Sequence, residues 1–371
     1  MPLAYPWVQD LNPFGNGGLT NAFAEGPGLG VNGSRIVAVG YNSNASIAVI
    51  YSDDWGATWT AAVTPFDDVN GCYDVIWSDD DAQFVIVGQL GAFSAATSPD
   101  GITWTQQSTP DAFYLLKLDY SPTDVAYIAS GAEAGGDTIF VSTDGAVTWA
   151  HLTTGSAVDG SSVNDVYWDA TLAAWFVGNS TGAEALWTST DIGATWTAVP
   201  TPLDGGTVMS VCHQTAPLDQ LVIGGFSGGG NFARSLDGGT TWTVVTQPSM
   251  PFVNAVADAN GVLLAGGDPV GPGSCIASSD DGGVTWVDDV SPFDDATSYV
   301  LTLYWAPVAG TALAGGDGGT VVNGQFVTIA SAGPTPPVIV TQYQRIYGWT
   351  VNISDDALET IDPVLTSPQG F

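Results

Sequence analysis

Carboxylates that recur beside proline are the side chains of this sequence best placed to do chemistry. A Ser-Pro or Thr-Pro pair precedes acidic residues in segments 64–68, 109–111, 201–204 and 291–295. Carboxylates next to an aromatic ring can hold a polar ligand or a Ca²⁺ ion, which prefers oxygen ligands. The alternative is that these acids only solvate and shape loops. The predicted ligand-binding residues are Phe66, Asp67, Asp68, Asp111, Asp204, Phe293, Asp294 and Asp295.

Other side chains that could hold a cofactor lack the necessary spacing. The acids do not follow the ligand pattern of an EF-hand, so Ca²⁺ stays open and no other cofactor is predicted. The cysteines, at 72, 212 and 275, are scattered and odd in number, which favours buried free thiols over disulfides. Neither His151 nor His213 belongs to a zinc-like pattern. No residue qualifies as a catalytic candidate.

The charge balance excludes several kinds of partner. The chain of 371 residues has 38 acidic side chains and four basic ones, for a net charge of −34. Four cations cannot form the basic patch needed for nucleic acid or for an anionic membrane surface. No apolar run approaches the ~18 residues of a membrane span, and Met1–Trp7 lacks the features of a Sec signal. The sequence therefore predicts neither nucleic-acid binding nor membrane insertion.

A repeated motif explains how these side chains must be positioned. It reads Ser-x-Asp-x-Gly-x-Thr-Trp, with small variations, and recurs six times at intervals of 44 to 47 residues. An Asp in a tight turn can accept backbone N–H bonds, and a Trp at the start of the returning strand can bury a large surface. We therefore interpret these residues as structural. They are Asp54, Asp100, Asp144, Asp191, Asp237 and Asp281, with Trp59, Trp104, Trp149, Trp196, Trp242 and Trp286.

Short β-branched and aromatic runs, separated by Gly, Asp and Asn, predict four strands in each repeat. A seventh repeat begins near Thr297 without the motif and ends in a strand at 325–329. A period of about 45 residues is typical of β-propellers. We expect an all-β fold, a seven-bladed β-propeller of four-stranded antiparallel blades over residues 19–331. Residues 1–18 would form an N-terminal extension, and 332–371 a Pro-rich linker and C-terminal β arm.

The motif resembles the Asp-box, or BNR repeat, of a group of β-propellers that includes sialidases, xyloglucan-active glycosidases, sortilin-type receptors and photosystem assembly factors. The resemblance implies that the box hairpins lie on one face of the ring and the links between blades on the other. Sialidases clamp their substrate with three arginines. Here Arg35, Arg234 and Arg345 occupy such different contexts that they are not expected to converge.

Two other relatives imply different activities. A glycosidase needs two carboxylates about 5 to 9.5 Å apart, with the pKa of the acid raised. This glycoside hydrolase, with its carboxylate pair on the link face, is the alternative function. Photosystem assembly factors carry a basic patch, which four cations do not supply, so the sequence argues against that function.

The favoured function is a non-enzymatic structural or binding propeller of a bacteriophage virion, in the tail, a fibre or the capsid surface. It would assemble in the host cytoplasm, contact other virion subunits through its termini, and bind a host glycan. A scaffold in a salt-loving organism, cytoplasmic or extracellular, is a further alternative.

Overall fold

The computed structural model of the chain divides into two units, residues 1–337 and 338–371. The second unit, with the predicted C-terminal β arm, lies outside the described residues. The structure describes residues 7–9, 14, 18–28, 30, 33–42, 48–64, 71–90, 93–109, 114–133, 136–152, 158, 162–180, 183–227, 230–245, 250–268, 275–289, 299–308, 310–317 and 327–330.

The described strands form seven four-stranded antiparallel sheets. Six of them are continuous in sequence, and we number them as blades 1 to 6. Blade 1 contains β2 (Gly18–Pro27), β3 (Ser34–Asn42), β4 (Val49–Ser52) and β5 (Thr60–Ala61). Blade 2 contains β6 (Gly71–Ser78), β7 (Gln83–Leu90), β8 (Phe93–Ser98) and β9 (Thr105–Gln107). Blade 3 contains β10 (Tyr114–Ser121), β11 (Ala126–Glu133), β12 (Gly136–Ser142) and β13 (Ala150–Leu152).

The same order repeats in the next three blades. Blade 4 contains β14 (Val163–Asp169), β15 (Ala174–Asn179), β16 (Leu186–Ser189) and β17 (Thr197–Ala198). Blade 5 contains β18 (Thr207–Gln214), β19 (Gln220–Ser227), β20 (Gly230–Ser235) and β21 (Thr243–Val245). Blade 6 contains β22 (Phe252–Ala259), β23 (Val262–Asp268), β24 (Ile276–Ser279) and β25 (Val287–Asp288).

The remaining sheet, the composite blade, joins the two ends of the ring. It contains β26 (Tyr299–Ala306), β27 (Thr311–Asp317), β28 (Val327–Ala330) and, as its outermost strand, β1 (Trp7–Gln9). Trp7 pairs with Ile329 and Gln9 with Val327. The prediction of seven blades, all within residues 19–331, is therefore wrong. Six blades are continuous in sequence, the first of them starting at Gly18, and the predicted N-terminal extension supplies the outermost strand of the remaining sheet.

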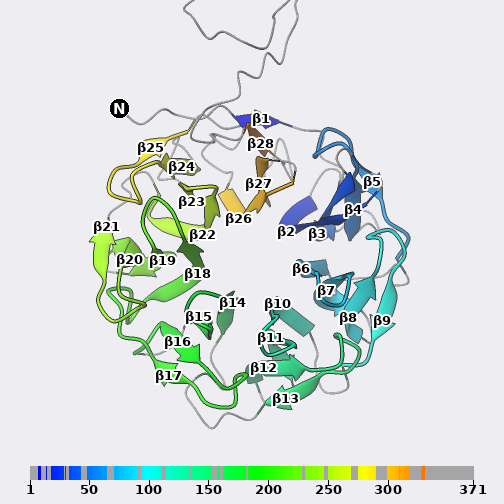
Figure 1. The fold of residues 1–371 in the computed structure, drawn as a ribbon, viewed down its shortest axis with the longest axis horizontal. Coiled ribbons are helices and arrows are strands. Elements are labelled where there is room, and N and C mark those ends of the chain that lie inside the picture. The colour runs from blue at the N-terminus through cyan, green and yellow to red at the C-terminus, as the bar shows by residue number, and fades with distance from the viewer. Residues whose placement is uncertain are drawn as a thin grey trace, which may run out of the picture. The chain divides into compact units, whose positions relative to one another are not determined.

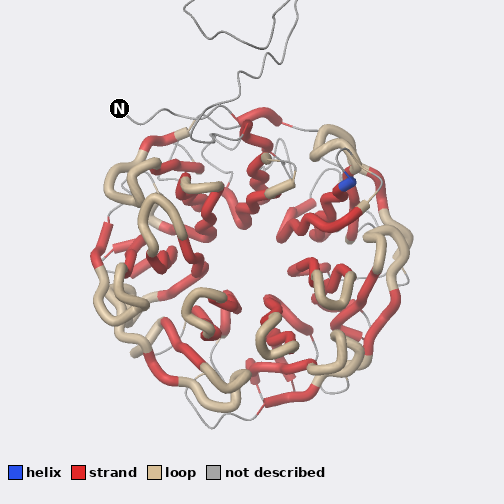
Figure 2. The backbone as a smooth tube through the Cα atoms, viewed as in Figure 1, coloured by secondary structure: helices blue, strands red, loops and turns tan. Residues whose placement is uncertain are grey.

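The inner strands close a circle around a central axis. Each first strand contacts the first strands of its two neighbours, and β26 contacts β2 (Figure 1). Strands make up almost all of the regular structure among the described residues (Figure 2). A closed ring leaves no long sheet edge open to pair with another chain.

The core lies between blades rather than at the axis. One buried cluster joins blades 1 and 2 through Val37, Phe84 and Ile86, and another joins the composite blade to blade 1 through Ile36 and Leu313. Clusters of this kind fill every interface around the ring. Apolar faces of neighbouring sheets thus bury each other.

Every inner strand carries a β-bulge near its start. The register with the second strand shifts by one residue in all seven sheets. A bulge redirects the side chains that follow it. The skipped residues are Asn21, Tyr73, Leu116, Asn164, Met209, Asn254 and Leu301.

Candidate functional site

The six predicted boxes form the hairpins between third and fourth strands, on what we call the box face. In blade 5, Asp237 Oδ1 accepts hydrogen bonds from Ser235 Oγ at 2.8 Å and Thr241 N at 2.7 Å. Asp237 Oδ2 accepts one from Thr241 Oγ1 at 2.6 Å. Hydrogen bonding from Thr241 lowers the pKa of Asp237 to about 2. The carboxylate therefore stays ionised and holds the turn closed.

The other boxes repeat this geometry. In four of them, a Thr hydroxyl donates a hydrogen bond of 2.6 Å to the box carboxylate. These carboxylates belong to Asp54, Asp144, Asp191 and Asp281. The second box is one residue shorter, and Asp100 accepts N–H bonds from Ile102 and Thr103 instead. The box tryptophans Trp104, Trp149 and Trp196 are buried, while Trp59, Trp242 and Trp286 are partly buried against core clusters.

Two arginines tie neighbouring blades together. Buried Arg35 pairs with Asp53 at 2.7 Å and donates to the Asp100 carbonyl in the next box. Arg234 donates to the Gly282 carbonyl, again in the box of the following blade. Each guanidinium therefore holds a different hairpin, and the two do not converge on a substrate. Arg345 lies outside the described residues.

Of the predicted ligand-binding residues, the structure describes only Asp204. Its carboxylate accepts hydrogen bonds from Thr201 N at 2.9 Å, Thr201 Oγ1 at 3.0 Å and Ala185 N at 3.1 Å. Asp204 therefore shapes its own link and joins it to blade 4. The other predicted ligand residues lie outside the described residues: Phe66, Asp67, Asp68, Asp111, Phe293, Asp294 and Asp295.

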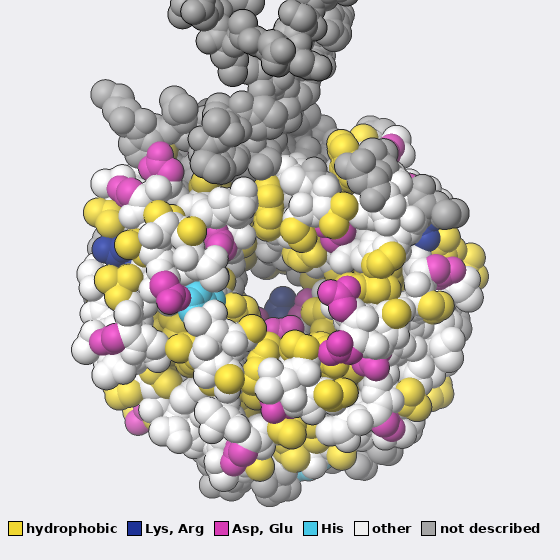
Figure 3. Space-filling view, in the orientation of Figure 1, with side chains coloured by type: hydrophobic (Ala, Val, Ile, Leu, Met, Phe, Trp, Pro, Cys, Tyr) yellow, Lys and Arg dark blue, Asp and Glu magenta, His cyan; other side chains and the backbone are white. Residues whose placement is uncertain are grey.

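A channel runs along the axis of the ring. It has a volume of about 790 Å³ and is walled by the first strands of all seven sheets. Figure 3 looks into it and shows basic and acidic side chains deep inside. Lys117 is the one Lys or Arg among the described residues that line it. The face from which the first strands start, opposite the box face, is called the link face below.

Four acidic residues line this channel: Asp258 from blade 6 and, from three successive blades, Asp74, Asp119 and Asp165. Asp74 accepts the N–H of Leu118 at 3.0 Å, and Asp119 accepts that of Trp168 at 2.7 Å. Asp165 Oδ2 accepts the N–H of Val211, also at 2.7 Å. Each carboxylate thus joins its own blade to the next. Among the described residues, the second oxygen of Asp165, Oδ1, has no hydrogen-bond donor.

Enclosure inside the ring changes how these acids titrate. Desolvation raises the pKa of Asp119 to about 7 and that of Asp165 to about 7, although each accepts hydrogen bonds that favour the ionised form. Desolvation also raises the pKa of Asp74. The positive charge of Lys117 opposes this shift at Asp74 and Asp165. Near neutral pH the channel is therefore acidic but only partly ionised.

Large aromatic side chains lie at the link-face ends of several strands. Phe226 and Phe252 form an edge-to-face pair with ring centroids 4.9 Å apart. They are 37% and 40% exposed, which is high for phenylalanine. Phe252 begins β22 two residues before Asn254, which lines the channel. Tyr73 and Tyr114 form a second edge-to-face pair at the link-face ends of β6 and β10.

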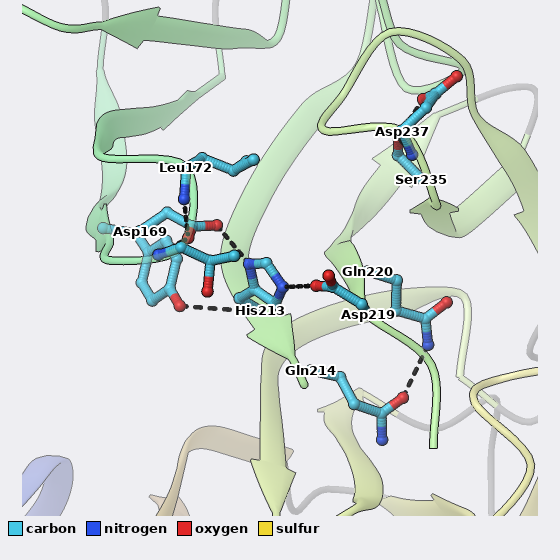
Figure 4. A network of polar contacts seen from close by, with 10 residues as sticks. Asp169, Leu172, His213, Gln214, Asp219, Gln220, Ser235 and Asp237 are labelled. Atoms are coloured by element: carbon cyan, nitrogen blue, oxygen red, sulfur yellow. Dashed lines mark hydrogen bonds and ion pairs between the residues drawn. The ribbon is translucent and has the colours of Figure 1, made fainter. Parts of the chain in front are cut away.

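At the box face, a histidine joins blades 4 and 5 (Figure 4). His213 Nδ1 lies 2.6 Å from Asp169 and His213 Nε2 lies 2.6 Å from Asp219. Desolvation acts to lower the pKa of His213, but its two carboxylate partners outweigh this and the pKa is raised. Both ring nitrogens can donate only in the imidazolium form. We call this arrangement the histidine clasp.

These side chains were present in the sequence but carried no motif. Asp74 and Asp165 interrupt otherwise apolar strands, each followed directly by Val. A charged residue within a buried inner strand is a signal that could have identified the channel. Among the described residues, no group of three His, Cys, Asp or Glu side chains is arranged to hold a metal ion. Likewise, no helix in the described part of the chain is long and apolar enough to cross a membrane.

Fold and sequence together define a BNR-type β-propeller. Residues 29–202, slightly less than half of the chain, match the family of the photosynthesis system II assembly factor YCF48. No curated protein is significantly similar in sequence.

Solved structures show the same fold. YCF48 from Cyanidioschyzon merolae is 18% identical, with a TM-score of 0.61, over 88% of this chain and 98% of that one. YCF48 bound to D1 peptide is 15% identical, with a TM-score of 0.63, over 88% and 97%. The WD40 propeller domain of Doa1 is 11% identical, with a TM-score of 0.57, over 87% and 97%.

These similarities correct the functional interpretation of the sequence. The matching family is an assembly factor, and one similar structure holds a peptide, whereas no similarity points to a virion. The predicted phage tail, fibre or capsid role, the virion location, and the virion-subunit and glycan partners are therefore wrong. Residues 29–202 match the assembly-factor family although they contain only two basic side chains, Arg35 and Lys117, so the scarcity of cations does not exclude that relationship.

Proposed function

We propose that this protein is a non-enzymatic binding module that holds an extended segment of a partner polypeptide in the channel of its propeller. Support comes first from the channel itself, whose 790 Å³ volume matches the roughly 300–1,000 Å³ of typical ligand sites. Further support comes from YCF48, a protein of the same fold whose structure contains the D1 peptide. The first strands of all seven sheets line the channel, so a rigid scaffold positions its side chains.

The channel residues fit binding better than catalysis. A glycosidase needs a carboxylate of raised pKa near a second acid, and Asp119 and Asp165 satisfy the first requirement. Each, however, accepts a backbone N–H from the next blade, so its position serves the ring. The similarity to an assembly factor also favours a binding role. A carboxylate that fixes strands together is poorly free to move a proton onto a leaving group.

Filling the channel tests the proposal. Thr302 lines the channel one residue beyond the bulge of β26, the position that Lys117 occupies in β10. Thr302→Trp should obstruct the channel, whereas Thr123→Trp adds the same side chain to an exposed turn of blade 3. Fluorescence anisotropy would measure the binding of labelled peptides, with the D1 peptide among them.

We expect Thr302→Trp to weaken binding at least tenfold and Thr123→Trp to leave it within twofold. Circular dichroism would confirm that both variants keep the wild-type fold. Equal binding of a peptide by the two variants would refute the proposal. So would a peptide array in which no peptide binds to the wild type or to either variant.

A further inference from the structure

The first observation concerns charge within the channel. Four carboxylates, those of Asp74, Asp119, Asp165 and Asp258, line the channel with one lysine, and the whole chain has a net charge of −34. No ion pair joins Lys117 to a described carboxylate within 4.0 Å. An entering cation would therefore be attracted, and an entering anion would be repelled by both the channel and the surrounding surface.

The second observation concerns unused hydrogen-bonding capacity. A carboxylate offers about four acceptor sites, and each oxygen of Asp74 and of Asp119 accepts one backbone N–H. Asp165 uses one oxygen, which leaves Oδ1 open among the described residues. A guanidinium or ammonium group donates several N–H bonds and would pair with such an oxygen. The channel thus has a specific acceptor as well as a general field.

The third observation is independent of charge. Phe226 and Phe252 expose a large apolar surface beside the link-face opening. Asp165 is the first residue after the bulge of β14, and Ala255 is the first residue after the bulge of β22, so the two lie at the same depth. Ala255 is three residues along β22 from Phe252. Three extended residues span on the order of 10 Å. Along the axis of the ring, an apolar anchor on the phenylalanine pair is therefore about three residues from a side chain at the depth of Asp165.

We infer that the channel selects a basic segment, entering from the link face with an apolar residue on Phe226 and Phe252 and a Lys or Arg side chain at Asp165. This inference rests on the proposed function and names the class of its partner. Asp74 and Asp119 supply the surrounding negative field, and Lys117 limits it. The occupant is a polypeptide segment, because an extended chain presents an apolar and a cationic side chain at this spacing along one strand.

Charge-swapped peptides test the inference. The probe is a nine-residue synthetic peptide with Phe and Arg three residues apart, and it is compared with versions that carry Arg→Glu or Phe→Ser alone. We expect the Arg→Glu peptide to bind at least 30-fold and the Phe→Ser peptide at least fivefold more weakly. Raising the salt from 50 to 300 mM should weaken only the Arg peptide.

Protein variants locate the effect. Asp165→Asn should weaken the Arg peptide about tenfold, whereas Asp280→Asn removes the same charge from an exposed box residue and should change it less than twofold. Phe226→Ser should weaken binding of the Phe-containing peptide but not that of its Phe→Ser version.

The outcomes separate this inference from the proposed function. If acidic or neutral peptides bind as tightly as the basic one, and Thr302→Trp still blocks them, the channel binds peptides without the selectivity inferred here. If Asp280→Asn weakens the Arg peptide as much as Asp165→Asn does, the attraction is a property of total charge and the inference is wrong. If no peptide binds in a manner sensitive to Thr302→Trp, the proposed function itself fails.

Discussion

Asp165 should destabilise the folded propeller when it is ionised, and its removal should show this directly. Asp165→Asn eliminates the charge but keeps a side-chain oxygen that can accept the Val211 N–H. The usual destabilising consequence of breaking an interblade hydrogen bond is thereby avoided. The substitution isolates the electrostatic effect of placing a carboxylate inside the ring.

The size of the effect follows from the pKa. Desolvation raises the pKa of Asp165 from 3.8 to about 7, and each pH unit of difference corresponds to about 1.4 kcal/mol. A folded-state pKa above the unfolded value means that the folded chain holds the proton more tightly. Stability from this group is therefore greatest at low pH and declines between about pH 4 and pH 7. At pH 8.5 the ionised carboxylate should cost at most about 4 kcal/mol, and at pH 5 somewhat under half of that.

Urea denaturation followed by tryptophan fluorescence measures this effect at the two pH values. Asp165→Asn should raise the free energy of unfolding by about 2–4 kcal/mol at pH 8.5 and by about 1–2 kcal/mol at pH 5. Asp280→Asn, at an exposed position, should change it by less than about 0.5 kcal/mol at either pH. A less stable Asp165→Asn protein, or a gain independent of pH, would refute the reasoning about the channel.

Three further predictions concern the rest of the ring. His213→Gln should lower the free energy of unfolding by on the order of 2 kcal/mol at pH 6 and by less at pH 8.5. The reason is that a histidine with a raised pKa stabilises the fold only while its ring is protonated. A loss of stability that grows with pH would contradict the histidine clasp. Asp191→Ala removes the hydrogen-bond acceptor for Ser189 and Thr195. It should lower the free energy of unfolding, measured by urea denaturation, by about 1–2 kcal/mol. An unchanged free energy of unfolding would mean that the box does not stabilise its hairpin. Deletion of residues 1–10 removes β1 from the composite blade, so that β28 becomes the edge strand. Aggregation measured by light scattering should then increase. Unchanged light scattering would show that ring closure does not need β1.

The repeating box made much of the fold predictable. A motif every 44 to 47 residues places one hairpin in each of six blades, and local turn chemistry at residues such as Asp54 and Gly56 explains it. The closure of the ring was not predictable in the same way. Strand β1 has three residues and pairs with β28 more than 300 positions away, so no local pattern announces the pairing.

The channel was hidden for a related reason. Asp74 and Asp165 were visible within predicted inner strands, but their direction depends on a bulge whose register only the second strand defines. The acids in the links form the more conspicuous pattern in the sequence, but the one that the structure describes, Asp204, is bound to its own loop. The total charge is a matter of composition, but composition could not show that four acids line one channel.

A photo-crosslinking measurement tests the central claim most directly. A basic nonapeptide with a photoreactive residue beside its Arg would be irradiated with the wild-type protein, and the adducts mapped by mass spectrometry. The account predicts adducts on channel residues such as Tyr73, Leu116 and Met209, lost when an unlabelled basic peptide competes and absent in Thr302→Trp. Adducts confined to the box hairpins or the outer strands, with the channel unlabelled, would contradict it.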